Sequence, residues 1–396
     1  MTMKMTLTIS ECKRDFLTPC HSYLYENLLT KWSLNGINQA DGKSAECLDQ
    51  DWQIKPMGRI RLLSQCRQLY TFSHAYLETK EPKWFAVLEP LFKFIVQHYL
   101  FTENNIERWR FSLDDDLKPL DNTSDAYALA FVLLSFSFYF NATKDKTALE
   151  LMKKTDNFLV QYMSADNGGF YESYPIDQTQ QRRQNPHMHL LEGYIAAFNA
   201  TNETCYKTQI ISILELAEAR FYDKKSRSLL EFFELDWQAD KSDGQITEPG
   251  HHFEWVWLLH QAYKVHPKES YLTMATNLWE KACQYGFDPK GGIYNQITAE
   301  SGEPLDSSKR IWPITEFLKA ACVQIESNQE QAQTIHTGLN FTFNHYLKVD
   351  GRWNEYLDGE NNPIDANLSG TTSYHIFLGL TEVINWMQRN PIKGIG

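Results

Sequence analysis

Several stretches of the chain repeat hydrophobic residues at intervals of three and four, which is the period of an amphipathic helix. In the stretch 148–163, for example, Leu151, Phe158 and Tyr162 fall on one face of such a helix. The same pattern predicts helices over 126–140, 148–163, 189–198, 209–221 and 253–263.

Short segments rich in glycine, aromatic and acidic residues lie between the helical stretches and recur about every sixty residues. Their centres are Trp109, Phe170, Leu230, Ile293 and Trp353, which are 61, 60, 63 and 60 residues apart. A fixed period of this length is typical of repeat architectures. Each period predicts two helices and one loop or short hairpin of extended chain.

Six such units account for roughly the whole chain, and repeated helix pairs either stack as an open solenoid or close into a ring. The segment 130–140, AFVLLSFSFYF, is apolar on nearly every side. Such a helix suits an inner ring that is covered on both sides better than an exposed surface. We therefore predict an all-α fold, an (α/α)6 barrel of six helix hairpins with short β-hairpin loops, formed by residues 1–396 as a single catalytic domain.

Composition and charge exclude two classes of partner. The 396 residues are 42% hydrophobic and 14% aromatic, which is enough to bury a sizeable core. The 50 acidic and 38 basic residues give a formal net charge of -12, and the sequence has no basic stripe for nucleic acid or an anionic membrane. We expect neither of these as a partner.

The N-terminal segment and the cysteines indicate the compartment. The segment MTMKMTLTISECKRDF lacks the apolar stretch and small-residue cleavage site of a secretory signal, and no run of about eighteen apolar residues follows. The seven cysteines are scattered without CxxC spacing, which argues against a disulfide framework or a zinc site. We predict a cytoplasmic protein with reduced cysteines.

Chemically capable residues occur at one matching point of each unit, near the start of the helix that follows the loop. In a closed ring, equal phase means equal height, so these residues would converge on one central cleft. Capping of free helix amides explains a Ser or Asp at such a point, but not an arginine, three histidines and two large aromatic residues. The six residues, spaced by 60, 62, 62, 61 and 63, are Arg67, Tyr127, His189, His251, Trp312 and His375.

Two of the histidines are followed by a glutamate three residues later, which places both side chains on one face of a helix. Glu192 can therefore hold or polarise His189, and Glu254 can do the same for His251. The di-iron bundle motif runs in the opposite order, Glu-x-x-His, and no further carboxylate pair completes it. We predict no metal.

Local context refines the choice of histidines. Pro249 and Gly250 predict a tight turn that presents His251 at the entrance of the next helix. In the preceding unit we prefer His189 over His187, which we expect in a loop where it can still touch a substrate.

Trp312 and Glu316 lie one helical turn apart, a pattern often found in carbohydrate clefts. The ring face of a tryptophan stacks on the apolar face of a sugar, while a carboxylate accepts hydrogen bonds from its hydroxyl groups. This pair therefore indicates that the cleft binds a sugar.

With these residues in place, the chain resembles the N-acylglucosamine 2-epimerase superfamily, and within it the mannose-isomerase type. The resemblance implies an (α/α)6 barrel, in agreement with the repeat. One departure is Tyr374, which precedes the last histidine where a tryptophan is common. The motifs, spread over nearly the full chain, are QCRQLYTFSHAY (65–76), YALAF (127–131), RRQNPHMHLLEGY (182–194), PGHHFEW (249–255), WPITE (312–316) and SYHIF (373–377).

The resemblance also implies roles for individual residues. His251 and His375 would be the general acid and base near C1 and C2 of the open-chain sugar, and His189 would assist ring opening. The residues expected to hold the substrate are Arg67, Tyr127, Asn185, Glu192, Glu254, Trp312 and Glu316.

The predicted function is an aldose-ketose isomerase that interconverts D-mannose and D-fructose, or related unphosphorylated monosaccharides, through a cis-enediol. Histidine suits the proton transfers because its unperturbed pKa of about 6.5 lies near working pH, and no redox cofactor is required. A sugar 2-epimerase that uses the same histidine pair is the main alternative. A glycoside hydrolase and a non-catalytic sugar-binding protein rank below it, and a homodimer is left open.

Overall fold

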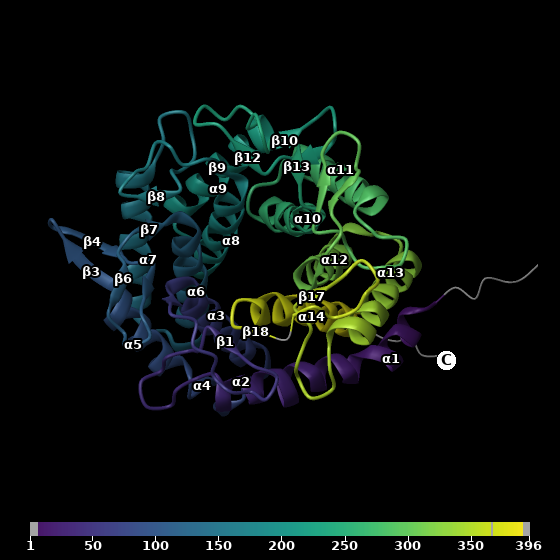
Figure 1. The fold of residues 1–396 in the computed structure, drawn as a ribbon, viewed down its shortest axis with the longest axis horizontal. Helices are drawn as coiled ribbons and strands as arrows, with labels where there is room; N and C mark the ends of the chain where they lie inside the picture. The colour runs from purple at the N-terminus through teal and green to yellow at the C-terminus, as the bar shows by residue number, and fades with distance from the viewer. Residues whose placement is uncertain (1–6, 366, 391–396) are drawn as a thin grey trace, which may run out of the picture.

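The fold is a closed ring of helix pairs, described by a computed structural model for residues 7–365 and 367–390. Figure 1 shows the inner helices around the centre of the ring, and each contacts the next until α14 meets α3. The inner helices are α3 (Leu62–Thr79), α6 (Ala126–Thr143), α8 (Gln184–Thr201), α10 (Pro249–Val265), α12 (Ile311–Gln324) and α14 (Thr372–Arg389).

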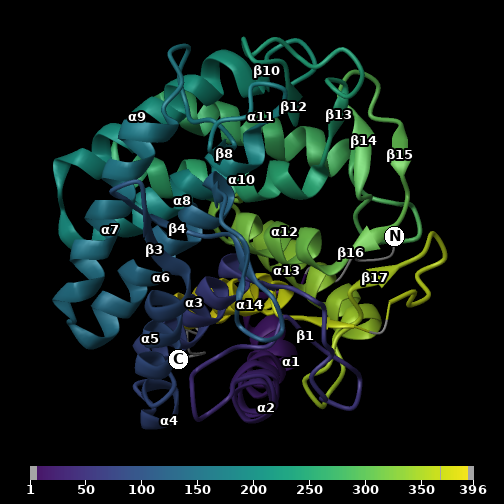
Figure 2. The same cartoon turned by 60° about the vertical axis from the view of Figure 1, so that its left-hand side comes forward.

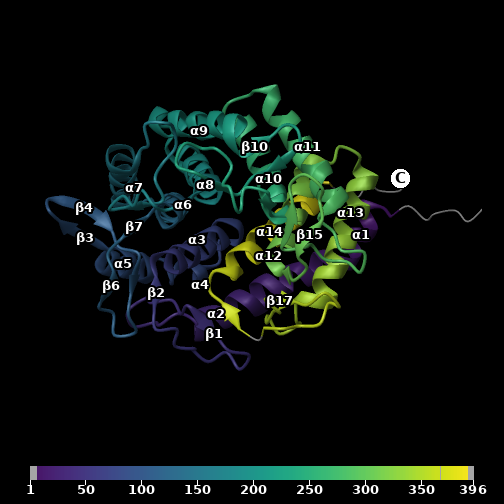
Figure 3. The same cartoon turned by 45° about the horizontal axis from the view of Figure 1, so that its top comes forward.

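An outer layer of helices covers the inner ring (Figures 1 and 3). Four of these helices continue into π-helical segments, namely η1 (Ser22–Leu28), η2 (Leu159–Met163), η3 (Ala217–Phe221) and η4 (Thr342–Tyr346). The outer helices are α1 (Ile9–His21), α2 (Leu29–Asn35), α4 (Pro82–Phe85), α5 (Leu88–Tyr99), α7 (Lys146–Phe158), α9 (Thr204–Leu216), α11 (Glu269–Tyr285) and α13 (Asn328–Phe341).

Helix α6 shows why the inner ring is apolar on nearly all sides. Among the described helices it alone is long and apolar enough to cross a membrane by length and composition, yet 67% of it is buried inside the protein. It packs between α3 and α8 and beneath α7, so neighbouring helices cover it in three directions. The hydrophobic run 130–140 therefore records burial within the ring.

Short strands connect the units, and most of their pairs join neighbouring units. The strand before each inner helix pairs antiparallel with a strand in the next loop around the ring, and the β1–β18 pair closes the circle by joining the two ends of the chain. Figure 2 shows β13 to β17 gathered beside one end of α10 and α12, whereas the β3–β4 hairpin projects outward in Figures 1 and 3. The strands are β1 (Cys47–Leu48), β2 (Ile60–Arg61), β3 (Leu100–Glu103), β4 (Ile106–Trp109), β5 (Ser112–Leu113), β6 (Pro119–Asp121), β7 (Ser124–Asp125), β8 (Ser173–Tyr174), β9 (Arg182–Arg183), β10 (Tyr222–Asp223), β11 (Ser228–Leu229), β12 (Phe232–Phe233), β13 (Ile246–Thr247), β14 (Gln296–Thr298), β15 (Pro304–Asp306), β16 (Lys309–Arg310), β17 (Tyr356–Leu357) and β18 (Leu368–Ser369).

These strand pairs also fix where the inner helices begin. The first backbone N–H of α8 donates to the carbonyl of Glu231 at 3.1 Å, and that of α12 donates to the carbonyl of Glu355 at 3.2 Å. The first N–H of α6 donates to the carbonyl of Glu172 at 2.9 Å. A free amide at each helix start is thus satisfied by the next unit, and the same loop position carries a glutamate in all three units.

The predicted architecture is confirmed, and two local predictions need correction. Helix α8 begins at Gln184, five residues before the predicted start, because Pro186 is tolerated within a first helical turn. Pro249 is the first residue of α10, so Gly250 lies in the helix and not in a turn. A Cβ at Gly250 would lie 2.5 Å from the ring of Trp312, which explains the glycine by close packing.

Candidate active site

A cavity of about 170 Å³ opens where the inner helices begin, and all six phased residues line it. Each stands in the first two turns of its inner helix, so the equal phase in the sequence becomes equal height in the ring. Eight of the ten predicted site residues line the cavity, namely Arg67, Tyr127, Asn185, His189, His251, Glu254, Trp312 and His375.

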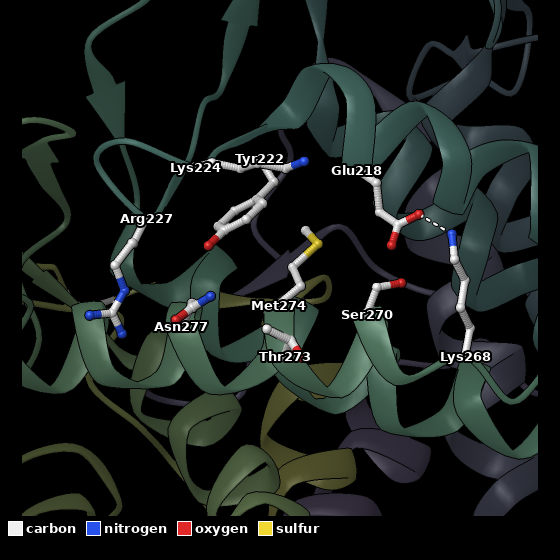
Figure 4. A pocket seen from close by; sticks show the side chains of 9 residues that line it. All are labelled: Glu218, Tyr222, Lys224, Arg227, Lys268, Ser270, Thr273, Met274 and Asn277. Carbon is white, nitrogen blue, oxygen red and sulfur yellow. Dashed lines mark hydrogen bonds and ion pairs between the residues drawn. The ribbon is translucent and has the colours of Figure 1, made fainter.

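A larger surface groove of about 570 Å³ lies elsewhere, between α11 and the β10–β11 hairpin (Figure 4). Lys268 spans it to pair with Glu218, and Tyr222 and Met274 face its interior. It contains none of the phased residues and no histidine. Because the phased residues line the smaller central cavity, we assign that cavity as the candidate active site.

His251 is held by two carboxylates. Its Nδ1 lies 3.0 Å from both oxygens of Glu231 and 3.6 Å from Glu248, and the residue as a whole is only 5% exposed. Burial opposes a charge on this imidazole, but Glu231 and Glu248 outweigh it and raise the pKa of His251 to about 10. His251 is therefore an imidazolium near neutral pH.

His375 has the opposite character. Its Nδ1 lies 2.8 Å from Glu316, and Glu316 in turn pairs with the fully buried Lys319 at 2.6 Å. Burial, together with the charge of Arg67, lowers the pKa of His375 well below its usual value. Because Lys319 neutralises Glu316, the carboxylate orients the His375 ring without charging it.

His189 lies between two buried carboxyl groups. Its Nδ1 is 3.5 Å from Glu192 and 3.7 Å from Glu254, and burial lowers the pKa of His189 to about 4. Both oxygens of Glu254 are buried without a hydrogen-bond partner. Burial and the charge of Glu316 raise the pKa of Glu254 well above its usual value, which favours its protonated form.

Arg67 is locked in place at the wall of the cavity. Its guanidinium donates to the Tyr127 hydroxyl at 2.8 Å and to the Thr371 carbonyl at 3.0 Å. It also lies 4.3 Å from the ring of Phe131 and 4.9 Å from that of Tyr374, which are cation–π distances. The charge is thus held by contacts to neutral groups and remains uncompensated toward the cavity.

Trp312 lies beside both His251 and His375, which differ in protonation state. Its ring centroid lies 5.0 Å from that of His251 and 5.7 Å from that of His375. Gly250 allows this approach because any larger residue would displace the indole. A planar apolar surface therefore lies beside a charged and a neutral imidazole.

The structure corrects three predictions about contacts. Glu192 and Glu316 do not line the cavity but lie behind it, where they bind His189 and His375. The partner of His251 is Glu231 and not Glu254, because Glu231 comes from the adjacent loop of the ring.

His187 is fully buried in α8 and accepts a hydrogen bond from the Phe170 amide at 2.9 Å, so it is structural.

Several residues of the site escaped the sequence analysis. Glu231 stands at the same loop position as Glu172 and Glu355, a recurrence that could have marked it. Glu248 lies just before Pro249, three residues from His251, and could have been found by the same spacing rule as Glu192. The remaining lining residues, which no pattern in the sequence marks, are Arg310, Thr371 and Thr372.

Two groups of side chains have a spacing that could hold a metal ion. His189, Glu192 and Glu254 form one group, and Glu254, Glu316 and His375 form the other, with ligand atoms within 4.8 Å of one another. The ammonium of Lys319 pairs with Glu316 at 2.6 Å and its charge also acts on Glu192 and Glu254, which raises the cost of adding another cation. The donor set therefore fits a proton-sharing network better than a metal.

Comparisons with known proteins identify the family of this chain. The model of the N-acylglucosamine 2-epimerase (GlcNAc 2-epimerase) family matches residues 44–379, so the chain belongs to this family of sugar isomerases and epimerases. It is 25% identical to a mannose-6-phosphate isomerase of Rhizobium meliloti over 93% of this chain and 96% of that protein. It is also 25% identical to a D-mannose isomerase of Marinomonas mediterranea, over 87% and 91% of the two chains.

The fold has close counterparts among solved structures. The cellobiose 2-epimerase of Bacillus thermoamylovorans superimposes with a TM-score of 0.85 at 18% identity, over 94% of this chain and 99% of that one. At this identity the likeness concerns the (α/α)6 barrel alone.

Proposed function

We propose that this protein is an aldose-ketose isomerase that interconverts D-mannose and D-fructose through a cis-enediol. The observation that carries the proposal is the pair His251 and His375, which face one small cavity with opposite protonation states. Isomerisation requires one group that removes a proton from carbon and one that supplies a proton to oxygen. The neutral and the charged imidazole meet these two needs.

In the proposed reaction, neutral His375 removes the proton from C2 of the open-chain aldose, and charged His251 donates a proton to O1. The result is a cis-enediol with His375 protonated and His251 neutral. His251 then takes the proton from O2 while His375 returns its proton to C1, which gives the ketose and restores both rings. Atoms and protons balance without a cofactor.

Two neighbours support this exchange. Asn185 lies 3.3 Å from Nε2 of His251, and its amide can accept from the charged ring through its oxygen or donate to the neutral ring through its nitrogen. The guanidinium of Arg67, buried at the cavity wall, stabilises negative charge that develops on the enediol oxygens. Both groups therefore act on the transition state and not only on the bound sugar.

Ring opening is assigned to His189 and Glu254. The substrate arrives as a closed ring, whose opening needs a proton donor and a proton acceptor. The raised pKa of Glu254 favours a protonated carboxyl and the lowered pKa of His189 favours a neutral imidazole, and the two groups lie 3.7 Å apart beside the cavity. Trp312 would stack on the apolar face of the sugar, and we propose that the chain performs these steps as one catalytic domain with an unphosphorylated monosaccharide.

A sugar 2-epimerase is the second candidate, favoured by one observation. His251 and His375 lie beside the same indole ring of Trp312, so they can address C2 from two directions. An epimerase needs two such groups, one to remove the proton and one to return it to the opposite face. The cellobiose 2-epimerase among the structural neighbours is consistent with this alternative.

Two further candidates have less support. A glycoside hydrolase needs one ionised and one protonated carboxyl group, whereas the carboxyls that line the cavity, Glu248 and Glu254, both have a raised pKa because of burial. A sugar-binding protein without activity does not need one neutral and one charged imidazole in its cavity. Both readings therefore rank below the isomerase and the epimerase.

Proton NMR of the purified protein with D-mannose in D2O tests the proposal, without added metal or nucleotide. Fructose is the expected product. Glucose with deuterium at C2 would establish epimerisation in place of isomerisation. Unchanged mannose under conditions where the protein is folded would contradict both and direct the search to disaccharides and N-acetylated sugars.

A further inference from the structure

A second cavity, of about 200 Å³, lies between the C-terminal halves of the inner helices. The candidate active site lies at the N-terminal ends of the same helices, so the two cavities occupy opposite ends of the barrel. Glu192, Tyr374 and Tyr70 stand between them, with the Tyr374 hydroxyl donating to Glu192 at 2.5 Å. The second cavity is therefore separated from the reaction chemistry by packed side chains.

Aromatic rings form much of the wall of this cavity. Tyr70, Phe138 and Trp257 line it, and the rings of Tyr70 and Phe138 meet edge to face at 4.6 Å. Aromatic faces carry partial negative charge and attract cations, most strongly where water is excluded. The ammonium of Lys319 already lies 4.4 Å from the ring of Trp257. Tyr70 and Phe138 therefore supply the remaining aromatic surface for a positive group.

The charged residues of the cavity have one sign. Glu192 and the half-buried Glu382 line it, and no lysine or arginine is among its described lining residues. The buried Lys319 is paired with Glu316, and its charge also acts on Glu192. Glu382, which accepts a hydrogen bond from the Trp257 ring at 3.4 Å, is therefore the carboxylate that remains for a ligand. His74 is engaged through both ring nitrogens, by Tyr70 at 3.0 Å and Glu78 at 3.3 Å.

The orientation of the helices adds to the negative potential. All inner helices direct their C-terminal ends toward this side of the barrel, and a helix C-terminus carries about half a negative elementary charge. An anionic ligand is therefore disfavoured by the carboxylates and by the backbone alike. A ligand that combines a positive charge with a small apolar body satisfies both the charge and the rings.

From these observations we propose that the second cavity is a ligand site, and that it binds a small organic ammonium ion. The ammonium would be bound by Glu382, with Glu192 contributing at longer range, while the apolar part of the ligand packs against Phe138 and Tyr70. This site does not depend on the proposed isomerase function, because none of the three catalytic histidines lines it and Glu382, Phe138 and Tyr70 lie outside the candidate active site.

Benzylamine, which is charged at pH 7, is the probe, and neutral benzyl alcohol is the matched control ligand. Calorimetric titration is expected to show saturable binding of one benzylamine per chain. Because hydrogen bonds to charged groups contribute about 1.5–3 kcal/mol, benzyl alcohol should bind about tenfold more weakly or worse. Equal binding of the two ligands, or no saturable binding of benzylamine, would overturn the proposal.

Variants locate the binding. Glu382→Gln should weaken the binding of benzylamine about tenfold and leave the binding of benzyl alcohol unchanged. Unchanged binding of benzyl alcohol also shows that the cavity is intact. Glu150→Gln, an equal charge change on the exposed face of α7, should have no effect. If His251→Asn removes benzylamine binding while Glu382→Gln does not, the ligand occupies the candidate active site and the proposal is wrong. Phe138→Leu gives a second test, because loss of the aromatic face should also weaken the binding of the ammonium group.

Discussion

The carboxylate of Glu231 lies 3.0 Å from Nδ1 of His251 with each of its two oxygens, although the two residues are 20 positions apart, Glu231 in the loop before α10 and His251 in α10 itself. The loop that carries Glu231 also pairs with the strand before α8, so the contact is built into the closure between neighbours. The charge of the imidazole therefore depends on the assembly of the barrel.

Glu231→Gln tests this dependence through pH. Without the carboxylate the pKa of His251 falls from about 10, so the charged ring is lost at lower pH and the alkaline limb of the kcat/KM profile should move to lower pH. Activity should fall about tenfold or more at pH 8, with a smaller loss at pH 6. An unchanged alkaline limb would contradict the assignment of His251 as the proton donor.

The same contact predicts the pH dependence of stability. The pKa of His251 is raised in the folded state, so its contribution to stability is fully present below the unfolded value of about 6.5 and is lost as pH rises toward about 10. The difference in unfolding free energy between wild type and Glu231→Gln should thus be larger at pH 6 than at pH 10. Urea denaturation at the two pH values measures it.

His375→Asn should abolish turnover while preserving the fold. Asparagine keeps a polar group toward Glu316 but cannot accept the proton from C2, so we expect a loss of about a thousandfold or more. Circular dichroism and the thermal midpoint check the fold. His336→Asn, at the surface beside Asp15, is the matched control and should retain full activity. Near-normal turnover of His375→Asn would rule out the assignment.

Lys319→Met tests the buried charge network behind the cavity. Glu192, Glu254 and Glu316 all raise the pKa of Lys319 against the effect of burial, so removal of the ammonium leaves buried carboxyls without compensation. A loss of about 3–5 kcal/mol in unfolding free energy is expected at pH 8, and less at pH 5 where carboxyls can take up protons. The exposed Lys146→Met is the control, and an equal effect of the two substitutions would contradict this role.

Gly250→Ala tests the position of Trp312. The added methyl would lie 2.5 Å from the indole and force it away from its place beside His251 and His375. We expect kcat/KM to fall about tenfold to a hundredfold, because small misplacement of a substrate-positioning group is costly. Gly359→Ala, whose nearest neighbour would lie 4.0 Å away, should leave activity unchanged. Comparable effects of both would argue against a specific role of this contact.

Much of the fold and the core of the site could be read from the sequence. The sixty-residue period and the apolar inner helices lead to a closed ring of six units, and equal phase along the chain becomes equal height around the cavity. Arg67, Tyr127, His189, His251, Trp312 and His375 therefore converge as expected. Periodicity carries this information because every unit folds in the same local way.

Only the tertiary structure decided which carboxylate meets which histidine. Spacing along a helix linked Glu254 to His251, yet the ring places Glu231 beside His251 and turns Glu254 toward His189. Likewise, Glu316 lies behind the cavity because Lys319, one turn further along α12, draws it there. Contacts between units depend on how neighbouring helices and loops pack, and the charge of each imidazole depends on those contacts, so neither follows from the pattern of any single unit.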